Sequence, residues 1–127
     1  MKLRCTTNSI RLRLRRSEVR QLLDNGHLED FVSFSPDDTF CFSIHLDQQA
    51  EQIFSQKDNG HIRLTIPWNL GRQWGQSDMV GISTDQPIGD GNVLQLLVEK
   101  DFPCMTRPEE DKSDFFGDLQ DKEPTAC

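Results

Sequence analysis

The stretch from residue 8 to residue 19, NSIRLRLRRSEV, alternates apolar and basic side chains and then changes to a helical pattern. Successive side chains of a β-strand point to opposite faces, so the alternation predicts a strand with one apolar and one cationic face. The apolar face holds Ile10, Leu12 and Leu14, and the cationic face holds Arg11, Arg13 and Arg15. Any fold of this chain must therefore bury one side of the strand and place three guanidinium groups on the other.

Charge is unevenly distributed along the 127 residues, whose formal net charge is −7. Residues 1–26 carry seven basic and two acidic side chains, whereas residues 105–127 carry three basic and seven acidic ones. The negative total argues against non-specific binding to nucleic acid or to an anionic membrane. We expect the acidic end either to be solvated or to fold over the basic face.

The sequence shows no secretory leader and no membrane span. Arginine at every second position leaves no apolar segment near the start, and no apolar run approaches the length that crosses a bilayer. The four cysteines are scattered without paired spacing: Cys5, Cys41, Cys104 and Cys127. We therefore expect a cytoplasmic protein with reduced thiols and no membrane partner.

Short alternating segments separated by turn residues predict most of the remaining chain as strands. These further strands are expected at 2–6, 28–34, 39–46, 52–56, 61–66, 79–84 and 93–102. Two short helices are expected, at 17–25 with Ser17 as the N-terminal cap, and at 67–76. Trp68 and Trp74 are expected to anchor the second helix by packing. No internal repeat stands out.

This order of elements predicts an α+β fold, with a curved, mostly antiparallel β-sheet or partial barrel and two short helices. Residues 93–98 are apolar on both faces, which is typical of a central strand covered on both sides. We expect residues 1–104 to form a single α+β domain. Residues 105–127 are expected to form an acidic, flexible C-terminal tail that contacts the domain at Phe115 and Phe116.

Three stretches together resemble a known family. They are NSIRLRLRRSEV at 8–19, QWGQSDMVGI at 73–82 and LLVEKDFPC at 96–104, followed by an acidic segment. The chain thereby resembles a family of short bacterial proteins of unknown function with the motifs N-S-I-R-L-R-L-x-x-S-E-V, W-x-x-S-D-x-V-G and L-V-E-K-D-F-x-C. The resemblance covers nearly the whole chain, and it implies membership of that family without implying an activity.

The cationic face predicts an anion-binding site, because guanidinium groups bind phosphate and carboxylate groups with two parallel hydrogen bonds. The candidate ligands are Arg4, Arg11, Arg13 and Arg15. The bound group would belong to an anionic small molecule or to a protein partner. Alternatively, Glu99 and Asp101, which share one face of the last strand, neutralise the arginines within the fold.

A cationic strand face beside acidic residues also resembles the triphosphate tunnel enzymes, whose β-barrel is lined by basic residues for phosphates and by glutamates for a divalent metal. This chain has Lys2 and Arg4 where those enzymes have alternating glutamates, so the analogy extends to the fold alone. Three functions therefore stay open: a non-catalytic binding module, a phosphoanhydride-acting enzyme, and an accessory protein with internally paired charges. We favour the first, and binding over catalysis.

Residue spacing does not support a metal or cofactor site. A metal at Glu99 and Asp101 would need further ligands, and no Cys-x-x-Cys or His-x-x-x-His motif is present. The available candidates are His45, His61, Glu109, Glu110, Asp111 and Asp114. We therefore expect no cofactor and no metal.

The cysteines are weak candidates for nucleophilic catalysis, because a reactive thiol needs a nearby base. Cys104 has none in its motif, and His45 shares an outward face with Cys41 and Ser43 at a spacing that is common by chance. The basic stripe carries no aromatic residue, whereas single-stranded nucleic acid is bound by aromatic and basic residues together. We therefore expect no catalytic residue and no nucleic-acid partner.

Overall fold

The computed structural model describes residues 1–102 and 112–122. Its strands are β1 (Lys2–Thr6), β2 (Ser9–Leu14), β3 (His27–Ser35), β4 (Asp38–Asp47), β5 (Phe54–Asp58), β6 (His61–Pro67), β7 (Gly81–Gly89) and β8 (Asn92–Lys100). Its α-helices are α1 (Arg16–Asn25) and α2 (Trp68–Gly75), and two 3₁₀ helices follow at Lys112–Asp114 and Gly117–Lys122. This combination of strands and helices is that of an α+β protein.

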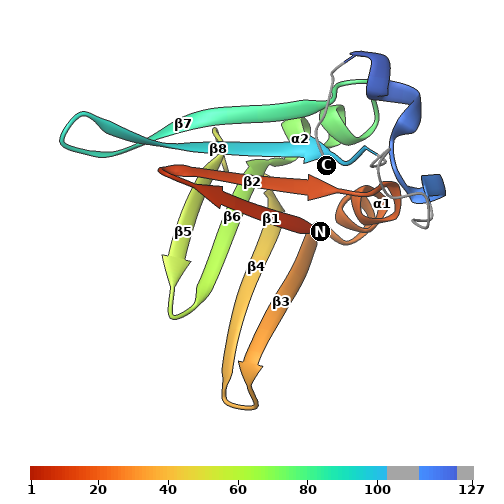
Figure 1. The fold of residues 1–127 in the computed structure, drawn as a ribbon. Helices are drawn as coiled ribbons and strands as arrows, with labels where there is room; N and C mark the ends of the chain where they lie inside the picture. Colours follow the sequence, from red (N-terminus) through yellow and green to blue (C-terminus); the bar gives the residue numbers. More distant parts are fainter. Residues whose placement is uncertain (103–111, 123–127) are drawn as a thin grey trace.

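The strands form two four-stranded sheets that run across each other (Figure 1). Sheet A has the order β1-β2-β8-β7, and sheet B has the order β3-β4-β6-β5. Every hairpin is antiparallel, whereas the two inner pairs, β2–β8 and β4–β6, are parallel. The described strands do not close into a barrel. The predicted fold class is confirmed, and the structure adds that the strands divide into two mixed sheets.

The two halves of the chain have the same order of elements. Residues 2–47 form β1-β2-α1-β3-β4, and residues 54–100 form β5-β6-α2-β7-β8. We call these halves the first and second copies of a ββαββ unit. Each sheet combines the first hairpin of one copy with the second hairpin of the other, so the copies exchange hairpins. Figure 1 shows this exchange in sheet A, where the N-terminal strands lie beside β8.

The strand registers of the two copies agree. Lys2 pairs with Arg13 in the first copy as Phe54 pairs with Thr65 in the second. Both second hairpins also carry an irregularity in register at the corresponding place, just before their turns. A repeat that extends to the register of every hairpin indicates two versions of one structural unit.

When the two copies are aligned by these strand registers, a short sequence repeat is also found. IRLRL at residues 10–14 corresponds to IRLTI at residues 62–66, and RQL at residues 20–22 corresponds to RQW at residues 72–74. The repeat is not evident along the sequence, because the matching stretches are short and the rest of the two copies has diverged. The expectation of no internal repeat was therefore wrong.

The core lies between the inner faces of the two sheets. Its completely or almost completely buried aliphatic side chains include Leu12, Leu14, Leu96 and Val98 from sheet A and Ile44, Leu64 and Ile66 from sheet B. The inward faces predicted for β2 and β4 are therefore correct. Burial of each such side chain contributes about 2 kcal/mol to folding.

Helix α1 is capped differently from the prediction. Its N-cap is Arg15, whose backbone N–H donates a hydrogen bond to Oε1 of Glu18 at 2.9 Å. Ser17 lies within the first turn and is not the cap. At the other end Gly26 has a φ of 79°, the left-handed conformation that stops a helix and that glycine adopts without strain.

Helix α2 packs closely against α1. Trp74 is completely buried, and its indole N–H donates a hydrogen bond to the carbonyl of Val80 at 3.0 Å. A Cβ on Gly75 would lie only 2.9 Å from the side chain of Leu23 in α1. The glycine that weakens α2 as a helix therefore allows the two helices to approach each other.

The described part of the acidic end packs on the rest of the molecule. Phe115, Phe116 and Leu119 are buried, and the guanidinium group of Arg16 lies 4.5 Å from the centroid of the Phe116 ring. The contact expected at Phe115 and Phe116 is therefore present. The predicted domain boundary between residues 104 and 105 lies outside the described residues.

Strand β8 is central in sheet A, as its sequence predicts, but within residues 1–102 and 112–122 no second layer of strands or helices covers its outer face. Val93 is 43% exposed and Leu97 is only partly buried. Among the described residues, the expected cover is present on the inner face, while the outer face carries long polar side chains. The apolar residues of β8 pack mainly through the inner face.

A side chain from sheet A covers part of the edge of sheet B. The backbone N–H and the hydroxyl group of Ser55 in β5 donate hydrogen bonds to Oε1 of Gln86 in β7, at 2.6 and 3.0 Å. Nε2 of Gln86 donates a hydrogen bond to the carbonyl of Ser55 at 3.2 Å. The Gln86 amide therefore replaces a neighbouring strand at this position and links the two sheets.

Candidate functional site

The predicted arginine stripe lies on the outer face of sheet A. Arg4 in β1 stands directly opposite Arg11 in β2, and Lys2 stands directly opposite Arg13. Like charges at directly opposed positions destabilise a strand pair unless a counter-charge is near. The face therefore requires anions, either from the chain or from outside it.

The carboxylate of Glu99 forms ion pairs with two of the arginines. Oε1 of Glu99 lies 3.0 Å from Nε of Arg11 and 3.4 Å from Nε of Arg13. The Glu99 side chain is only 8% exposed, while those of Arg11 and Arg13 are 32% and 17% exposed. Glu99 therefore pairs with the guanidinium groups of two neighbouring residues of the stripe.

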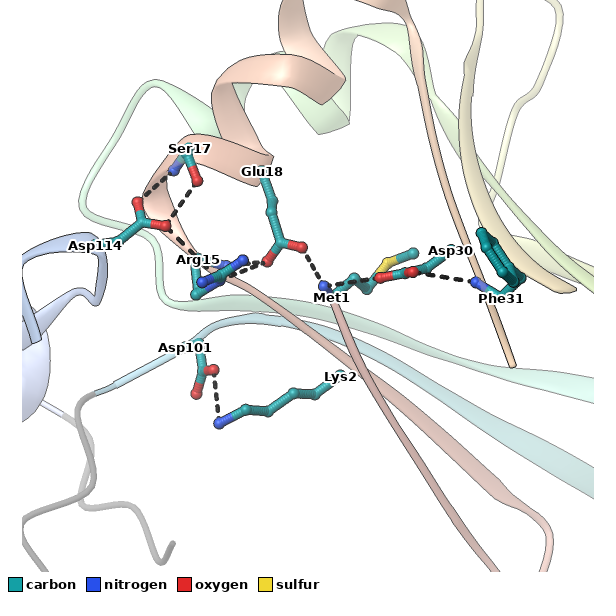
Figure 2. Close-up of polar contacts among 9 residues, drawn as sticks. All are labelled: Met1, Lys2, Arg15, Ser17, Glu18, Asp30, Phe31, Asp101 and Asp114. Carbon is teal, nitrogen blue, oxygen red and sulfur yellow. Dashed lines mark hydrogen bonds and ion pairs between the residues drawn. The ribbon is translucent and has the colours of Figure 1, made fainter. Parts of the chain in front are cut away.

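Asp101, the residue directly after β8, forms an ion pair with Lys2. Its Oδ2 lies 3.1 Å from Nζ of Lys2, and the same ammonium group lies 5.4 Å from the centroid of the Phe115 ring. Asp101 is almost completely buried. Figure 2 shows Lys2 reaching across to this carboxylate. The two acidic residues at the end of β8 thus contact different cations.

Arg15 lies apart from the other three arginines, at the start of α1. Its Nε is 3.4 Å from Oε1 of Glu18 and 3.7 Å from Oδ2 of Asp114 (Figure 2). The amino group of Met1 contacts the other oxygen of Glu18. Arg15 therefore belongs to an ion-pair cluster around the helix and is not part of a continuous site with Arg4 and Arg11.

Asp114 occupies the N-terminus of α1. It accepts hydrogen bonds from the backbone N–H and the hydroxyl group of Ser17, at 2.8 and 2.7 Å (Figure 2). A carboxylate is stabilised there by unpaired N–H groups and by the helix dipole. Asp118 similarly pairs with Arg16 at 2.6 Å. The described acidic segment neutralises the end of the stripe and leaves Arg4 and Arg11 uncovered.

A shallow pocket of about 330 Å³ lies beside the turn between β1 and β2. We call it the β1–β2 pocket; its lining residues are Arg4, Thr6, Thr7, Ser9, Arg11 and Gln95. The lining contains two guanidinium groups, hydroxyl groups and an amide, and it contains no carboxylate. Arg4 makes no ion pair within the part of the chain that the structure describes. The pocket thus presents hydrogen-bond donors with a net positive charge.

All three histidines of the chain lie on the outer face of sheet B. The hydroxyl group of Ser43 is 2.7 Å from Nε2 of His61 and 3.1 Å from Nε2 of His45. The ring of His27 stacks on that of His45, with centroids 5.8 Å apart. Ser43 is completely buried beneath these rings. Ser43 therefore bridges two imidazoles and is not exposed to a substrate.

The surroundings of His45 lower the pKa of its imidazole. Its burial lowers its pKa from the ordinary 6.5, and the positive charge of Arg63 and the neighbouring imidazoles of His27 and His61 lower it further. Glu29 acts in the opposite direction. Burial and the neighbouring positive groups therefore favour the neutral form of His45.

Of the metal candidates that the structure describes, His45 and His61 lie near each other on sheet B, apart from Glu99 and Asp101 of sheet A. Cys41 lies on the outer face of sheet B and is partly buried, while Cys104, Glu109, Glu110 and Asp111 lie outside the described residues. Within residues 1–102 and 112–122, no group of three His, Cys, Asp or Glu side chains is arranged to hold a metal ion. Nor is any helix in those ranges long and apolar enough to span a membrane.

The sequence pattern places His45 and Ser43 on one face of a strand, but it does not indicate the cluster that they form with the other histidines. His27, His45 and His61 come from three different strands, and the parallel pairing of β4 with β6 brings them together. The one available signal was the correspondence of IRL in β2 with IRL in β6, which places Arg63 where the first copy has Arg11.

Comparison with known proteins gives a family and no activity. No curated protein and no solved structure matches the chain. The model of a family of unknown function, DUF7009, matches residues 1–120, which include all strands and both α-helices described above. The chain therefore belongs to DUF7009, a family of unknown function.

Proposed function

We propose that this protein is a non-catalytic binding module whose β1–β2 pocket receives an anionic group of a small molecule or of a protein partner. The observation that carries the proposal is the composition of this pocket, where Arg4 and Arg11 face each other without a carboxylate in the lining. An anion between the two guanidinium groups relieves their repulsion and forms charge-assisted hydrogen bonds.

The surrounding residues support a small oxyanion or carboxylate as the bound group. Thr6, Thr7 and Ser9 supply hydroxyl donors beside the guanidinium groups, and Gln95 supplies an amide. A volume of about 330 Å³ accommodates a small ligand or the acidic end of a larger one. Because the pocket is open, solvent competes, so we expect an affinity that falls with added salt.

One observation favours the alternative of an accessory protein with internally paired charges. Glu99 is nearly buried and contacts both Arg11 and Arg13, which is the arrangement that internal pairing requires. The two functions differ at Arg4, because internal pairing assigns no task to that residue. The phosphoanhydride-acting enzyme receives less support, since the arginines lie on the outer face of a sheet and the described strands do not close into a barrel around them.

The proposal is tested by thermal unfolding with a panel of anions: sulfate, phosphate, tripolyphosphate, nucleotides and dicarboxylates. The measurements are made at about pH 8, above the range in which an ordinary imidazole titrates. A ligand at a hundredfold excess over its dissociation constant stabilises the folded state by about 2.7 kcal/mol. We expect at least one anion to raise the Tm of the wild type and to leave the Tm of Arg4→Ala unchanged.

Arg20→Ala is the matched control, because it removes one exposed arginine from α1 and changes the net charge equally. It should keep the full increase in Tm. A panel without any increase, or an increase that persists in Arg4→Ala, would contradict the proposed site. Repeating the panel with Mg²⁺ and assaying phosphate release tests the enzyme alternative, which requires metal-dependent turnover.

A further inference from the structure

The repeat gives the β1–β2 pocket a counterpart in sheet B. A second pocket, of about 340 Å³, lies beside the turn between β5 and β6, at the corresponding place in the second copy. We call it the β5–β6 pocket; its lining residues are Gln56, Lys57, Asp58, His61 and Arg63. Arg63 corresponds to Arg11, since both follow the isoleucine of the repeated IRL sequence.

The two pockets differ in their counter-charges. In sheet A the residue directly opposite Arg13 is Glu99, which contacts Arg11 as well. In sheet B the residue at the corresponding position of β4 is His45, which stands directly opposite Thr65. Arg63 is exposed and makes no ion pair within the described residues. The carboxylate that neutralises the first copy is thus replaced by an imidazole in the second.

We propose that the outer face of sheet B is a second anion site, in which Arg63 binds a tetrahedral oxyanion and protonated His45 and His61 strengthen the binding at acidic pH. This site is independent of the function proposed above, because it uses a different sheet. Its ligand is a sulfate-like or phosphate-like group, either free or at the end of a small molecule.

The charged groups around the site predict proton-dependent binding. Asp58 lies in the pocket directly opposite His61, and Glu29 lies opposite Ser43 on β3. With neutral imidazoles, these two carboxylates offset the positive charge of Arg63. Protonation of the histidines reverses the balance. Among the described residues, the other titratable groups on this face are Cys41 of β4 and His27 of β3, and Lys57 of β5 lines the pocket from a strand position opposite Ile62.

The hydrogen bonds of the cluster permit protonation. With neutral rings, the hydroxyl group of Ser43 donates to one Nε2 and accepts from the other. When both rings are protonated, the same oxygen accepts from both, because a hydroxyl oxygen has two lone pairs. The bridge therefore survives the change of charge, and the cost of protonation is the burial of the charged His45 ring together with repulsion among the imidazolium groups and Arg63. A bound anion offsets the repulsion.

The experiment follows the imidazole proton resonances by NMR during pH titrations with and without sulfate. Sulfate keeps one charge across the titration, and the three histidines all lie on this face, so their resonances report on this site alone. A unit charge about 4 Å away contributes about fivefold to affinity even at the dielectric constant of water. We therefore expect at least fivefold tighter sulfate binding at about pH 5.5 than at about pH 8.

Linkage gives a second readout from the same titrations. If protonation of His45 or His61 strengthens sulfate binding about fivefold, saturating sulfate raises the pKa of that imidazole by about 0.7 unit. Arg63→Ala should abolish both effects, and Arg20→Ala, which removes an exposed arginine elsewhere, should keep both. Arg63 is exposed, so its loss should leave the fold intact, as an unchanged amide spectrum would verify.

The outcomes are decisive in either direction. Histidine pKa values that do not respond to sulfate, or that respond equally in Arg63→Ala, overturn the proposal. His45→Gln should keep sulfate binding at about pH 8 and weaken its increase at about pH 5.5. Titration with glycerol phosphate separates the two ligand sources, since a site for a terminal phosphate should bind it at least as tightly as sulfate. Binding of sulfate alone assigns the site to free oxyanions.

Discussion

At the scale of single residues, Glu99 forms the ion pairs that neutralise arginines on the outer face of sheet A. It is nearly buried, and it lies within 3.4 Å of the guanidinium groups of both Arg11 and Arg13. A buried carboxylate is tolerated only when such partners replace the water that it loses. The arginine stripe thus contains residues with different tasks: Arg13 neutralises Glu99, while Arg4 faces solvent without an ion pair among the described residues.

This difference predicts opposite behaviour for two sets of variants. The double variant Arg11→Ala/Arg13→Ala leaves Glu99 without a counter-charge, so the free energy of unfolding should fall by about 2 kcal/mol after allowance for solvent around the guanidinium groups. Arg4→Ala should change it by less than about 0.5 kcal/mol. Urea denaturation monitored by tryptophan fluorescence measures both.

Addition of Glu99→Gln to the double variant is the control. It removes the unpaired charge and should recover part of the lost stability, because a neutral amide is less costly to bury than a carboxylate. A double variant as stable as the wild type would show that Glu99 needs neither arginine.

At the scale of elements, the described acidic segment behaves as part of the domain. Phe116 is 5% exposed and lies beneath the guanidinium group of Arg16, and Asp114 binds the first turn of α1. By contrast, Phe34 near the tip of the β3–β4 hairpin is 70% exposed. The side chain of Phe116 is thus buried in the molecule, whereas that of Phe34 is exposed to solvent.

Replacement of each phenylalanine by alanine should separate these surroundings. Phe116→Ala should lower the free energy of unfolding by about 3 kcal/mol, because it removes a buried ring and leaves a cavity. Phe34→Ala should change it by less than about 0.5 kcal/mol. Chemical denaturation of the two variants gives the comparison. A loss for Phe116→Ala as small as that for Phe34→Ala would mean that the Phe116 ring does not stabilise the fold.

Local patterns in the sequence predict the individual strands and helices, but they do not predict which strands pair with each other. The alternation in residues 8–14 fixes which face of β2 is buried, and Asn25-Gly26 marks the end of α1. The pairing of β2 with β8 joins residues that are far apart in the chain, and no local pattern encodes it. The histidine cluster was missed for the same reason, since it depends on the pairing of β4 with β6.

At the scale of the whole molecule, the exchange of hairpins makes each copy incomplete. Each sheet takes two strands from each copy, and the parallel inner pairs β2–β8 and β4–β6 both join the two copies. The segment between residues 48 and 53, which connects the copies, belongs to no strand or helix. The stability of one copy therefore depends on contacts with the other.

A cut in this connection should be tolerated. Fragments 1–49 and 50–127, made separately, should each lack the fixed structure of the intact chain, because neither contains a complete sheet. Mixed in equal amounts, they should restore the amide NMR spectrum of the intact protein, with a midpoint of unfolding that depends on concentration. A fragment that shows its native resonances alone would contradict the mutual dependence of the copies.

The hydrogen bonds between Gln86 and Ser55 bear on how these molecules behave towards one another at high concentration. An unpaired strand edge is a template on which another chain can add a strand, and such additions lead to fibrous aggregates. At Ser55 the backbone donor and acceptor are already occupied by an amide of the same chain. A strand approaching β5 must displace that amide first, so this edge of sheet B opposes growth into a continuous sheet.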